Sequence, residues 1–267
     1  MPVLVRGGAR IAYEVDGEGP VVTLLHGFTQ SRLMWDELTG PLEAAHRVLR
    51  PDLRGHGETE VEAGGGYTMD DCVADLEALW DELGIEGTHL VGYSMGGRLA
   101  LHVAARRPQR LLSLVTVSAR TLPEAAREAR READEELARA IERNGIEWFV
   151  EHWGSLPMFA GVARRGDAFN SALRERRLRN RPAELAASLR GMGAGSAEAV
   201  AGALRGLEVP ALFIAGAEDA PYVEAAHTLA GLVRRGRVEI VAGAGHNVPA
   251  ERPLELAALV TAQLSTR

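Results

Sequence analysis

Short apolar runs alternate with longer helical patterns along most of this chain, and that alternation is the strongest constraint on its fold. Six runs have a β-branched or leucine-rich centre and end in turn residues: PVVTLLHGF, HRVLRPDLRGHG, THLVGYSMGG, LLSLVTVSA, VPALFIAGAED and RVEIVAGAGH. Such runs are typical of buried parallel strands, whose loops gather at their carboxyl ends. Helical patterns such as MDDCVADLEALWDELG would form the crossovers. We therefore predict an α/β fold with a mostly parallel sheet flanked by helices.

The alternation breaks once, between about residues 120 and 206. No strand pattern is apparent there, and alanine, arginine, glutamate and leucine dominate. We predict a helical cap at 120–206, inserted into a core formed by 1–119 and 207–267. The segment 120–206 holds 15 arginines against 13 acidic residues, although the whole chain has a net charge of −7. Most of these arginines are expected to pair with neighbouring glutamates, which leaves a few that could face an anionic ligand.

Composition limits the class of protein and of partner. The 267 residues are 46% hydrophobic, enough to fill a sizeable core. The negative net charge and the absence of a dominant basic cluster argue against nucleic acid as a partner. Cys72 is the one cysteine, so no internal disulfide can form, as suits a reducing compartment. With no signal-peptide core or membrane-length apolar run apparent, we expect a soluble, cytoplasmic protein.

The stretch GYSMG at residues 92–96 matches the pattern G-x-S-x-G. It follows the predicted strand THLV and precedes the helical pattern GGRLALHVAARRP, which is the order of a nucleophile elbow. The glycines let the backbone close tightly around the serine, and the helix start supplies N–H groups beside its oxygen. We predict that Ser94 is the reactive residue, and a structural turn serine is the alternative.

A reactive serine needs a base and an orienting acid, which follow it along the chain in the order acid, then histidine. His246 lies in a glycine-bounded loop after the last predicted strand and is the best placed histidine. The preceding strand ends in GAED, where G-x-x-D spacing favours Asp219 over Glu218. The backbone N–H groups of Phe28 and Met95 are predicted to form an oxyanion hole.

These motifs resemble those of the α/β-hydrolase superfamily. The resemblance rests on HGF, DLRGHGET, GYSMGG, GAED and GAGH and covers nearly the whole chain. It implies the fold and a Ser, Asp, His triad. It leaves the reaction open, because the superfamily includes esterases, C–C hydrolases, dehalogenases, lyases and hormone receptors.

Arg98 bears on the reaction because it follows Ser94 by four residues, on the same face of the predicted helix. A guanidinium there would suit a substrate carboxylate. The alternative is a structural arginine that bonds carbonyl groups of the cap or the sheet.

Arg130 lies in the predicted cap helix TLPEAAREARREADEELARAIERNG. Thr121 and Glu124 have capping-box spacing, and the Asn144-Gly145 pair predicts the end of the helix. An apolar stripe is expected at Leu122, Ala126, Ala129, Ala133, Leu137 and Ala140. Arg130 falls at the edge of that stripe, where no acidic partner is evident, so we predict that it faces a ligand.

Longer stretches narrow the resemblance. VGYSMGGRLAL, ARREADEELARAIERNGIEWFVEHWGSLPMF and RRLRNRPAELAASLRGMGAG resemble the 2-succinyl-6-hydroxy-2,4-cyclohexadiene-1-carboxylate (SHCHC) synthase family of menaquinone biosynthesis. The resemblance implies a carbon-oxygen lyase that eliminates pyruvate from a polycarboxylate cyclohexene intermediate. The triad serine then acts as a base, and no metal or organic cofactor is required. The residues implied in substrate binding are Arg98, Arg130, Arg177, Tyr93 and Trp153.

Two positions depart from the family pattern. The chain reads SARTLPEAA where the family usually has S-x-PGL, and Gly154 stands where an aromatic residue is common. For Tyr93 and Trp153, packing in the sheet and in the cap is the alternative to a role in binding.

Because the chain departs from the family pattern at two positions, a hydrolase of small esters, or of C–C bonds in acidic substrates, is the alternative function. A ligand-binding sensor with the same fold is the third.

Overall fold

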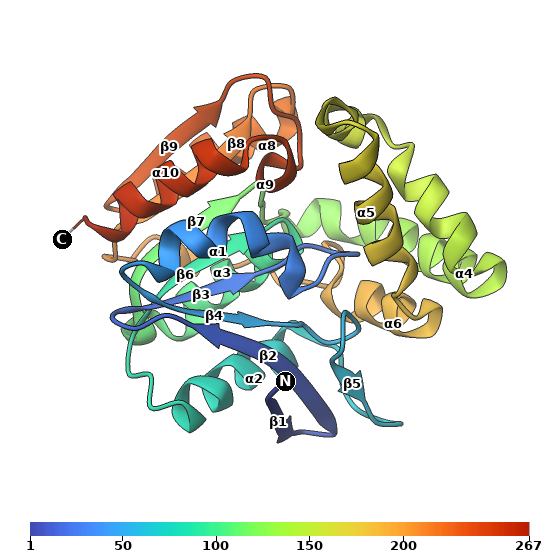
Figure 1. The fold of residues 1–267 in the computed structure, drawn as a ribbon, viewed down its shortest axis with the longest axis horizontal. Coiled ribbons are helices and arrows are strands. Elements are labelled where there is room, and N and C mark those ends of the chain that lie inside the picture. Colours follow the sequence, from blue (N-terminus) through green and yellow to red (C-terminus); the bar gives the residue numbers. More distant parts are fainter. Residues whose placement is uncertain (267) are drawn as a thin grey trace.

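A mostly parallel sheet forms the centre of the computed structural model, which describes residues 1–266. Within these residues the strand order is β1-β2-β4-β3-β6-β7-β8-β9, and β5 pairs with β2 (Figure 1). The strands are β1 (Val3–Arg6), β2 (Ala9–Asp16), β3 (Val21–Leu25), β4 (Arg47–Pro51), β5 (Glu60–Val61), β6 (Thr88–Tyr93), β7 (Leu111–Val117), β8 (Ala211–Gly216) and β9 (Gly236–Val241). Along this order, every neighbouring pair from β4 to β9 is parallel, so the predicted α/β fold is confirmed.

Each of the six predicted runs contains a strand, whereas β1, β2 and β5 were not predicted. These three strands form the antiparallel edge of the sheet. In β1 exposed and half-buried residues alternate, and most of the second half of β2 is half-buried. Partly solvated strands lack the continuous apolar run that marks a strand buried on both faces.

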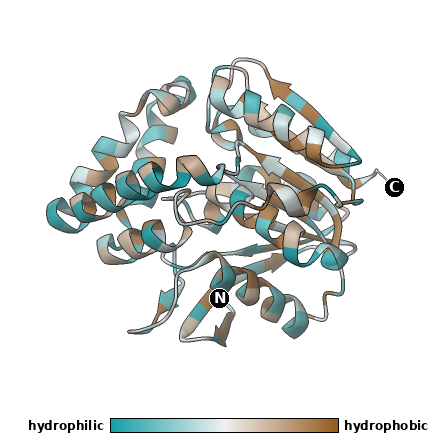
Figure 2. Cartoon of the chain, turned by 180° about the vertical axis from the view of Figure 1, so that it is seen from behind, coloured by the Kyte–Doolittle hydropathy of each residue, from teal (hydrophilic) through white to brown (hydrophobic). Residues whose placement is uncertain are grey.

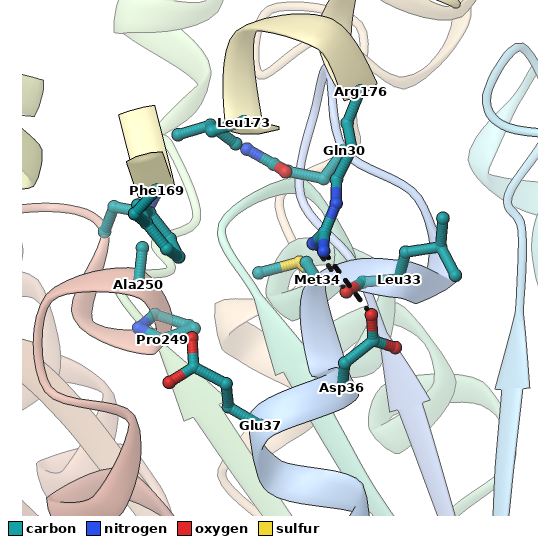
Figure 3. Close-up of a pocket in the computed structure, with 11 residues that line it drawn as sticks. Gln30, Leu33, Met34, Asp36, Glu37, Phe169, Leu173, Arg176, Pro249 and Ala250 are labelled. Carbon is teal, nitrogen blue, oxygen red and sulfur yellow. Dashed lines mark hydrogen bonds and ion pairs between the residues drawn. The ribbon is translucent and has the colours of Figure 1, made fainter. Parts of the chain in front are cut away.

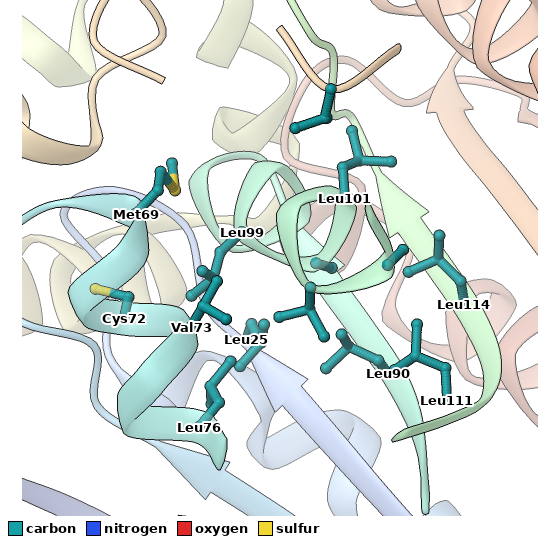
Figure 4. Packing of buried hydrophobic residues seen from close by; sticks show 14 of the residues in the cluster. Leu25, Met69, Cys72, Val73, Leu76, Leu90, Leu99, Leu101, Leu111 and Leu114 are labelled. Carbon is teal, nitrogen blue, oxygen red and sulfur yellow. The ribbon is translucent and has the colours of Figure 1, made fainter. Parts of the chain in front are cut away.

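Helices cover both faces of the sheet. They are α1 (Asp36–Glu43), α2 (Met69–Glu82), α3 (Met95–Arg106), α8 (Ala220–Leu232), α9 (Val248–Glu251) and α10 (Pro253–Leu264), with short 3₁₀ turns η1 (Arg32–Trp35) and η2 (Pro108–Arg110). One buried cluster joins α2, α3 and α8 to the sheet, and Figure 4 shows its packing between α2, α3 and the strands. A second cluster joins α1 and α10 to the opposite face. Residues 1–266 contain no helix that is both long and apolar enough to cross a membrane.

Only helical elements are described between β7 and β8. They are α4 (Glu124–Gly154), η3 (Pro157–Arg165), α5 (Asp167–Leu178), α6 (Pro182–Met192) and α7 (Ala201–Leu204). Helices α4, α5 and α6 lie together beside the sheet, and Figure 2 shows them largely hydrophilic on the outside. A buried cluster with Ile141 and Leu185 packs α4 against α6. Helix α7 contacts α3 and α8 instead, and the cap limits 120 and 206 remain a prediction.

The start and the buried face of α4 differ from prediction. The helix begins at Glu124 after Pro123, without a side-chain cap, so the proposed capping box is wrong. The predicted stripe is also wrong: Ala126, Ala129 and Ala133 are exposed, whereas Asp134, Ala138 and Ile141 are buried. Alanine side chains have too little apolar surface to determine which face of a helix is buried, so the packing of α4 on α6 determines it. Gly145, with φ 81° and ψ −178°, interrupts the helix.

A buried ion pair ties the segment after β4 to α2. The Arg54 side chain is 0% exposed and that of Asp75 is 6% exposed. Arg54 Nη2 donates to Asp75 Oδ1 at 2.8 Å, and Nη1 donates to the carbonyl of Gly66 at 2.7 Å. A buried guanidinium without its carboxylate would keep the cost of desolvation and lose the compensating charge.

We expect Asp75→Ala to lower the free energy of unfolding by about 3–5 kcal/mol, because it leaves Arg54 buried and uncompensated. Urea denaturation followed by circular dichroism measures this change. Asp81→Ala is the matched control on the same helix: the Asp81 side chain is 69% exposed and pairs with Arg110, so a loss below about 1 kcal/mol is expected. Equal losses in the two variants would contradict the prediction.

Candidate active site

Ser94 lies at the sharp turn between β6 and α3. Its backbone has φ 50° and ψ −106°, a conformation that L-residues rarely adopt, and its N–H donates to the carbonyl of Val117 at 2.9 Å. A Cβ added at Gly92 would lie 2.3 Å from the carbonyl oxygen of Gly96. A Cβ at Gly96 would lie 2.3 Å from the carbonyl oxygen of Leu25. Only glycine fits at both positions, so the turn has the geometry of a nucleophile elbow.

His246 and Asp219 complete a hydrogen-bonded chain from Ser94. The Ser94 Oγ lies 3.0 Å from His246 Nε2, and His246 Nδ1 lies 2.7 Å from Asp219 Oδ2. Asp219 follows β8, and its carboxylate accepts the Nδ1 proton. Nε2 is thereby left as the acceptor for the serine hydroxyl. This is the arrangement of a nucleophile or base, its proton acceptor and an orienting acid.

Glu218, the alternative acid, does not enter this chain. Its Oε2 accepts a hydrogen bond from Arg164 Nη2 at 3.0 Å, and the Glu218 side chain is 48% exposed. The structure therefore places Asp219, and not its neighbour, against the histidine.

The segment HGF lies beside the elbow and is held by His26. The N–H of Leu53 donates to His26 Nε2 at 2.9 Å, so Nδ1 carries the proton and donates to the carbonyl of Gly27 at 2.9 Å. Burial lowers the pKa of His26, which keeps the ring neutral. Phe28 follows and lines the same pocket as Ser94 and Met95. Met95 is the first residue of α3, where backbone N–H groups have no intrahelical partner.

A pocket of about 180 Å³ opens at the serine. One water needs roughly 10–15 Å³ of such space, so the pocket has room for an organic ligand. Its walls come from the core and from α4, η3 and α6 of the predicted cap. The lining residues are Phe28, Ser94, Met95, Arg98, Arg130, Trp153, Leu156, Met158, Ser188, Leu189, Met192, Gly193, Ala194, Tyr222 and His246.

Arg98 lines this pocket one helical turn from Ser94. Its Nη2 donates to the carbonyl of Met192 at 3.1 Å, whereas its buried Nε has no hydrogen-bond partner. No carboxylate of residues 1–266 forms an ion pair with it that would offset the charge. Burial lowers the pKa of Arg98 to about 10, so the group stays cationic at neutral pH. The contact with a cap carbonyl, which the structural alternative predicted, is present, and Arg98 also lines the pocket; recognition of a substrate carboxylate remains a prediction.

Arg130 also lines the pocket, but the expectation that it lacks an acidic partner is wrong. Its Nε donates to Asp134 Oδ1 at 2.8 Å, one helical turn away, and the Asp134 side chain is 3% exposed. Asp134 also accepts the N–H of Gly195 at 3.2 Å. The predicted stripe did not include Asp134, which is why no acidic partner was evident for Arg130. Arg130 therefore reaches the pocket as half of an ion pair.

Trp153 and Tyr93 hold different positions. Trp153 lines the pocket, and its ring centroid lies 5.4 Å from that of Phe28. Tyr93 is buried behind the site, with its ring centroid 5.6 Å from that of His246. A Cβ at Gly27 would lie 2.6 Å from the Tyr93 ring, so this ring packs directly under the HGF segment. Burial raises the pKa of the Tyr93 phenol.

Arg177 is not brought into the pocket of Ser94. It is 6% exposed and lines a neighbouring cavity of about 380 Å³ between α4, η3 and α5. Its guanidinium carbon lies 5.5 Å from the ring centroid of Phe159, and that ring in turn lies 5.8 Å from His246. Phe159 thus contacts both Arg177 and His246, and substrate binding by Arg177 remains a prediction.

Tyr222 lines the pocket and was not predicted. Its ring centroid lies 4.5 Å from that of His246, and the guanidinium carbon of Arg120 lies 5.2 Å from the Tyr222 ring. Its position three residues after Asp219, in the first turn of α8, is a signal that could have revealed it.

A further pocket, shown in Figure 3, contains no triad residue. It lies where α5 meets η1 and α1, and Arg176 reaches across it. Arg176 Nη1 donates to the carbonyl of Leu33 at 3.0 Å, and its Nη2 lies 3.6 Å from Asp36 Oδ2. The arginine side chain therefore joins the predicted cap to the core at this point.

We expect Gly96→Ala to disrupt the elbow, because the added carbon would lie 2.3 Å from one backbone carbonyl oxygen and 2.5 Å from another, those of Leu25 and His26. Backbone carbonyl groups cannot move aside as a flexible side chain can. The melting temperature should therefore fall by several degrees, as for a loss of about 1–3 kcal/mol in the free energy of unfolding. Gly231→Ala is the control in α8, where nothing lies within 4 Å of the added carbon. If Gly96→Ala melts with the control, the close approach is not a constraint.

Comparison with known proteins identifies the family. Residues 20–253 match the family model described as alpha/beta hydrolase fold. A Bacillus subtilis (strain 168) protein, provisionally named as a 2-succinyl-6-hydroxy-2,4-cyclohexadiene-1-carboxylate synthase, is 37% identical over 94% of this chain and 93% of its own length.

Two solved structures are similar over almost the whole chain. MenH from S. aureus superposes with a TM-score of 0.90 at 27% identity, over 94% of this chain and 97% of that chain. A thermophilic esterase from Thermogutta terrifontis, described with malate bound, has a TM-score of 0.84 at 29% identity, over 96% of this chain and 93% of that chain. The chain therefore belongs to the α/β-hydrolase fold family and, within that fold, to the 2-succinyl-6-hydroxy-2,4-cyclohexadiene-1-carboxylate synthase family.

Proposed function

We propose that this protein is an SHCHC synthase, a lyase of menaquinone biosynthesis that releases pyruvate from a cyclohexene intermediate bearing several carboxylates. The name of the Bacillus subtilis relative and the likeness to MenH from S. aureus support this reaction. The observation in the site that carries the proposal is Arg98, a half-buried cation that lines the pocket beside the serine.

A cation in this position favours an anionic substrate. The charge of Asp134 only partly offsets the effect of burial on the pKa of Arg98, and the Nη2 contact of Arg98 is to a neutral carbonyl. An incoming carboxylate would supply the missing charge and accept from the planar guanidinium. Arg130 lines the same pocket but is already paired with Asp134, so it adds a hydrogen-bond donor more than it adds net charge. A neutral ester could accept a hydrogen bond from these groups, but it carries no charge to offset that of Arg98.

Ser94 would act as the base in this reaction. His246 Nε2, 3.0 Å from the serine oxygen, takes the hydroxyl proton, and the oxygen takes a proton from carbon of the succinyl-bearing substrate. The electron pair of that C–H bond moves toward the ring, the diene forms, and the C–O bond to the pyruvyl group breaks. The leaving group takes back a proton from the histidine and departs as pyruvate. Asp219 stabilises the imidazolium that exists between these steps.

The backbone N–H groups of Phe28 and Met95 would stabilise the enolate that develops as the proton leaves carbon. Both residues line the pocket beside Ser94, and the N-terminal end of α3 adds a positive dipole. Trp153 would contribute an apolar wall against the ring of the substrate. These roles need no metal or organic cofactor.

Hydrolysis of a small ester, or of a C–C bond in an acidic substrate, is the second candidate. The triad geometry that makes Ser94 a base would equally let it attack a carbonyl carbon. The specific observation in its favour is the likeness to the Thermogutta terrifontis esterase, whose structure is described with the dicarboxylate malate bound.

Pyruvate release separates the two candidates. Purified protein is mixed with the pyruvyl-bearing menaquinone intermediate, pyruvate is measured with a coupled lactate dehydrogenase assay, and p-nitrophenyl acetate hydrolysis is followed in parallel. We expect rapid pyruvate release with feeble esterase activity, and Ser94→Ala should abolish the release while substrate binding persists. Efficient ester hydrolysis without pyruvate release would overturn the lyase.

We expect Arg98→Ala to lower kcat/KM for pyruvate release by about 10–100-fold, the scale of losing a charge-assisted contact of about 1.5–3 kcal/mol in a dry site. Arg106→Ala is the matched control, because Arg106 lies on the same helix but pairs with Asp70 and Glu198 away from the pocket. Steady-state kinetics on both variants make the comparison. An unchanged kcat/KM in Arg98→Ala would reduce the residue to its structural contact with Met192.

A further inference from the structure

The backbone N–H groups of residues 245–247 donate hydrogen bonds to the carboxylate of Glu251 and to one carbonyl of the predicted cap. Gly245 N donates to Glu251 Oε2 at 2.9 Å, and Asn247 N donates to Glu251 Oε1 at 3.2 Å. His246 N donates to the carbonyl of Met158 in η3 at 3.3 Å. The two oxygens of Glu251 thus hold the residues on either side of the histidine.

The histidine loop needs support from outside itself. It runs through the sequence AGAGH, and Gly243 has φ 64°, a conformation that favours glycine. Glycine-rich backbone has many accessible conformations, so its native one must be fixed by bonds to other elements. Glu251, at the end of α9, supplies those bonds by reaching back across one helical turn.

Glu251 itself depends on a cation from η3. It is 3% exposed, and within residues 1–266 its ion pair is with Arg164, whose Nη2 lies 3.1 Å from Oε2. A carboxylate this deeply buried needs a compensating charge. Arg164 Nη2 also lies 3.0 Å from Glu218 Oε2 and 3.0 Å from the carbonyl oxygen of Gly243. One guanidinium nitrogen therefore touches the loop of the triad acid and the loop of the triad histidine.

The backbone of η3 passes against Glu251 at a glycine. A Cβ added at Gly161 would lie 1.8 Å from Glu251 Oε2 and 2.6 Å from Arg164 Nη2. The Phe159 ring, two residues earlier, meets the His246 ring edge-on at a centroid distance of 5.8 Å. Helix η3 is thus fitted to the histidine loop through Met158, Phe159, Gly161 and Arg164.

We propose that Glu251 is a positioning residue that fixes residues 245–247, so that His246 Nε2 stays within hydrogen-bond distance of Ser94. Because Arg164 pairs with Glu251 from η3, this support also depends on the position of η3 against the histidine loop. Neither residue lines the pocket at Ser94, so both would act through His246. The proposal rests on the triad of the proposed function, but it does not depend on which substrate the triad serves.

Glu251→Gln is the first test. It keeps the size of the side chain but replaces one acceptor oxygen by an NH₂ group that faces donors. We expect kcat to fall by about 10–100-fold, as for a small misplacement of a catalytic group, with KM changed less than about twofold. The same loss is expected for pyruvate release and for p-nitrophenyl acetate hydrolysis, because both use His246.

Gly161→Ala and Arg164→Gln disturb the same carboxylate from the side of η3 and should lower kcat in the same direction. Gly202→Ala is the steric control, since nothing lies within 4 Å of its added carbon. Arg139→Gln is the charge control, since it breaks an exposed pair with Glu135 inside α4. Both controls should keep the wild-type kcat. If Glu251→Gln does not fold, these two η3 variants decide the question alone.

A substrate-free signal separates positioning from stability. The proton between His246 Nδ1 and Asp219 gives a downfield resonance in the ¹H NMR spectrum, assigned by its loss in His246→Ala. We expect this signal to broaden or shift in Glu251→Gln and Gly161→Ala and to stay unchanged in the controls. It requires no turnover, so it would test the positioning role even if pyruvate release were not observed.

A double variant completes the test. If Glu251 acts through the histidine, adding Glu251→Gln to His246→Ala should leave the residual activity unchanged. A further tenfold loss in that background would overturn the proposal. Wild-type kcat together with an unaltered proton signal in both Glu251→Gln and Gly161→Ala would overturn it as well.

Discussion

The close backbone contact at the elbow is the constraint on which the rest of the site depends. Gly96 packs against the carbonyl of Leu25, and Gly92 packs against Gly96, at distances that leave no space for a side chain. This contact aligns the ends of β3 and β6, turns Ser94 into an unusual backbone conformation, and brings the start of α3 beside the HGF segment. This backbone contact fixes the positions of the serine oxygen, of the backbone N–H groups beside it and of Arg98.

Much of this arrangement could be predicted because buried parallel strands leave a strong signal. The six apolar runs each contain a strand, and the turn residues after them hold Ser94, Asp219 and His246. The antiparallel edge strands were missed because they are partly solvated and have no continuous apolar run. The apolar runs were therefore sufficient to predict the parallel strands, including the partly exposed edge strand β9, and insufficient for the antiparallel edge.

The cap was harder to predict because its helices are rich in alanine and charge, and contact with other elements decides which face is buried. On α4 the buried face includes a charged residue, Asp134, which the predicted apolar stripe did not contain, and this error hid the partner of Arg130. For Arg177 the family resemblance implied substrate binding, whereas the structure places the side chain in a neighbouring cavity, in contact with the ring of Phe159. Which of two adjacent cavities a side chain enters is a matter of tertiary packing alone.

The break in α4 at Gly145 determines how one stretch of chain can line two walls of one pocket. Arg130 and Trp153 are 23 positions apart in the numbering, and in an unbroken helix that separation would span about 35 Å. Both nevertheless line the pocket at Ser94. The left-handed glycine changes the direction of the chain between them, so a charged wall and an aromatic wall come from a single continuous segment. A residue confined to helical φ and ψ at position 145 would carry the tryptophan away from the arginine and open the pocket on one side.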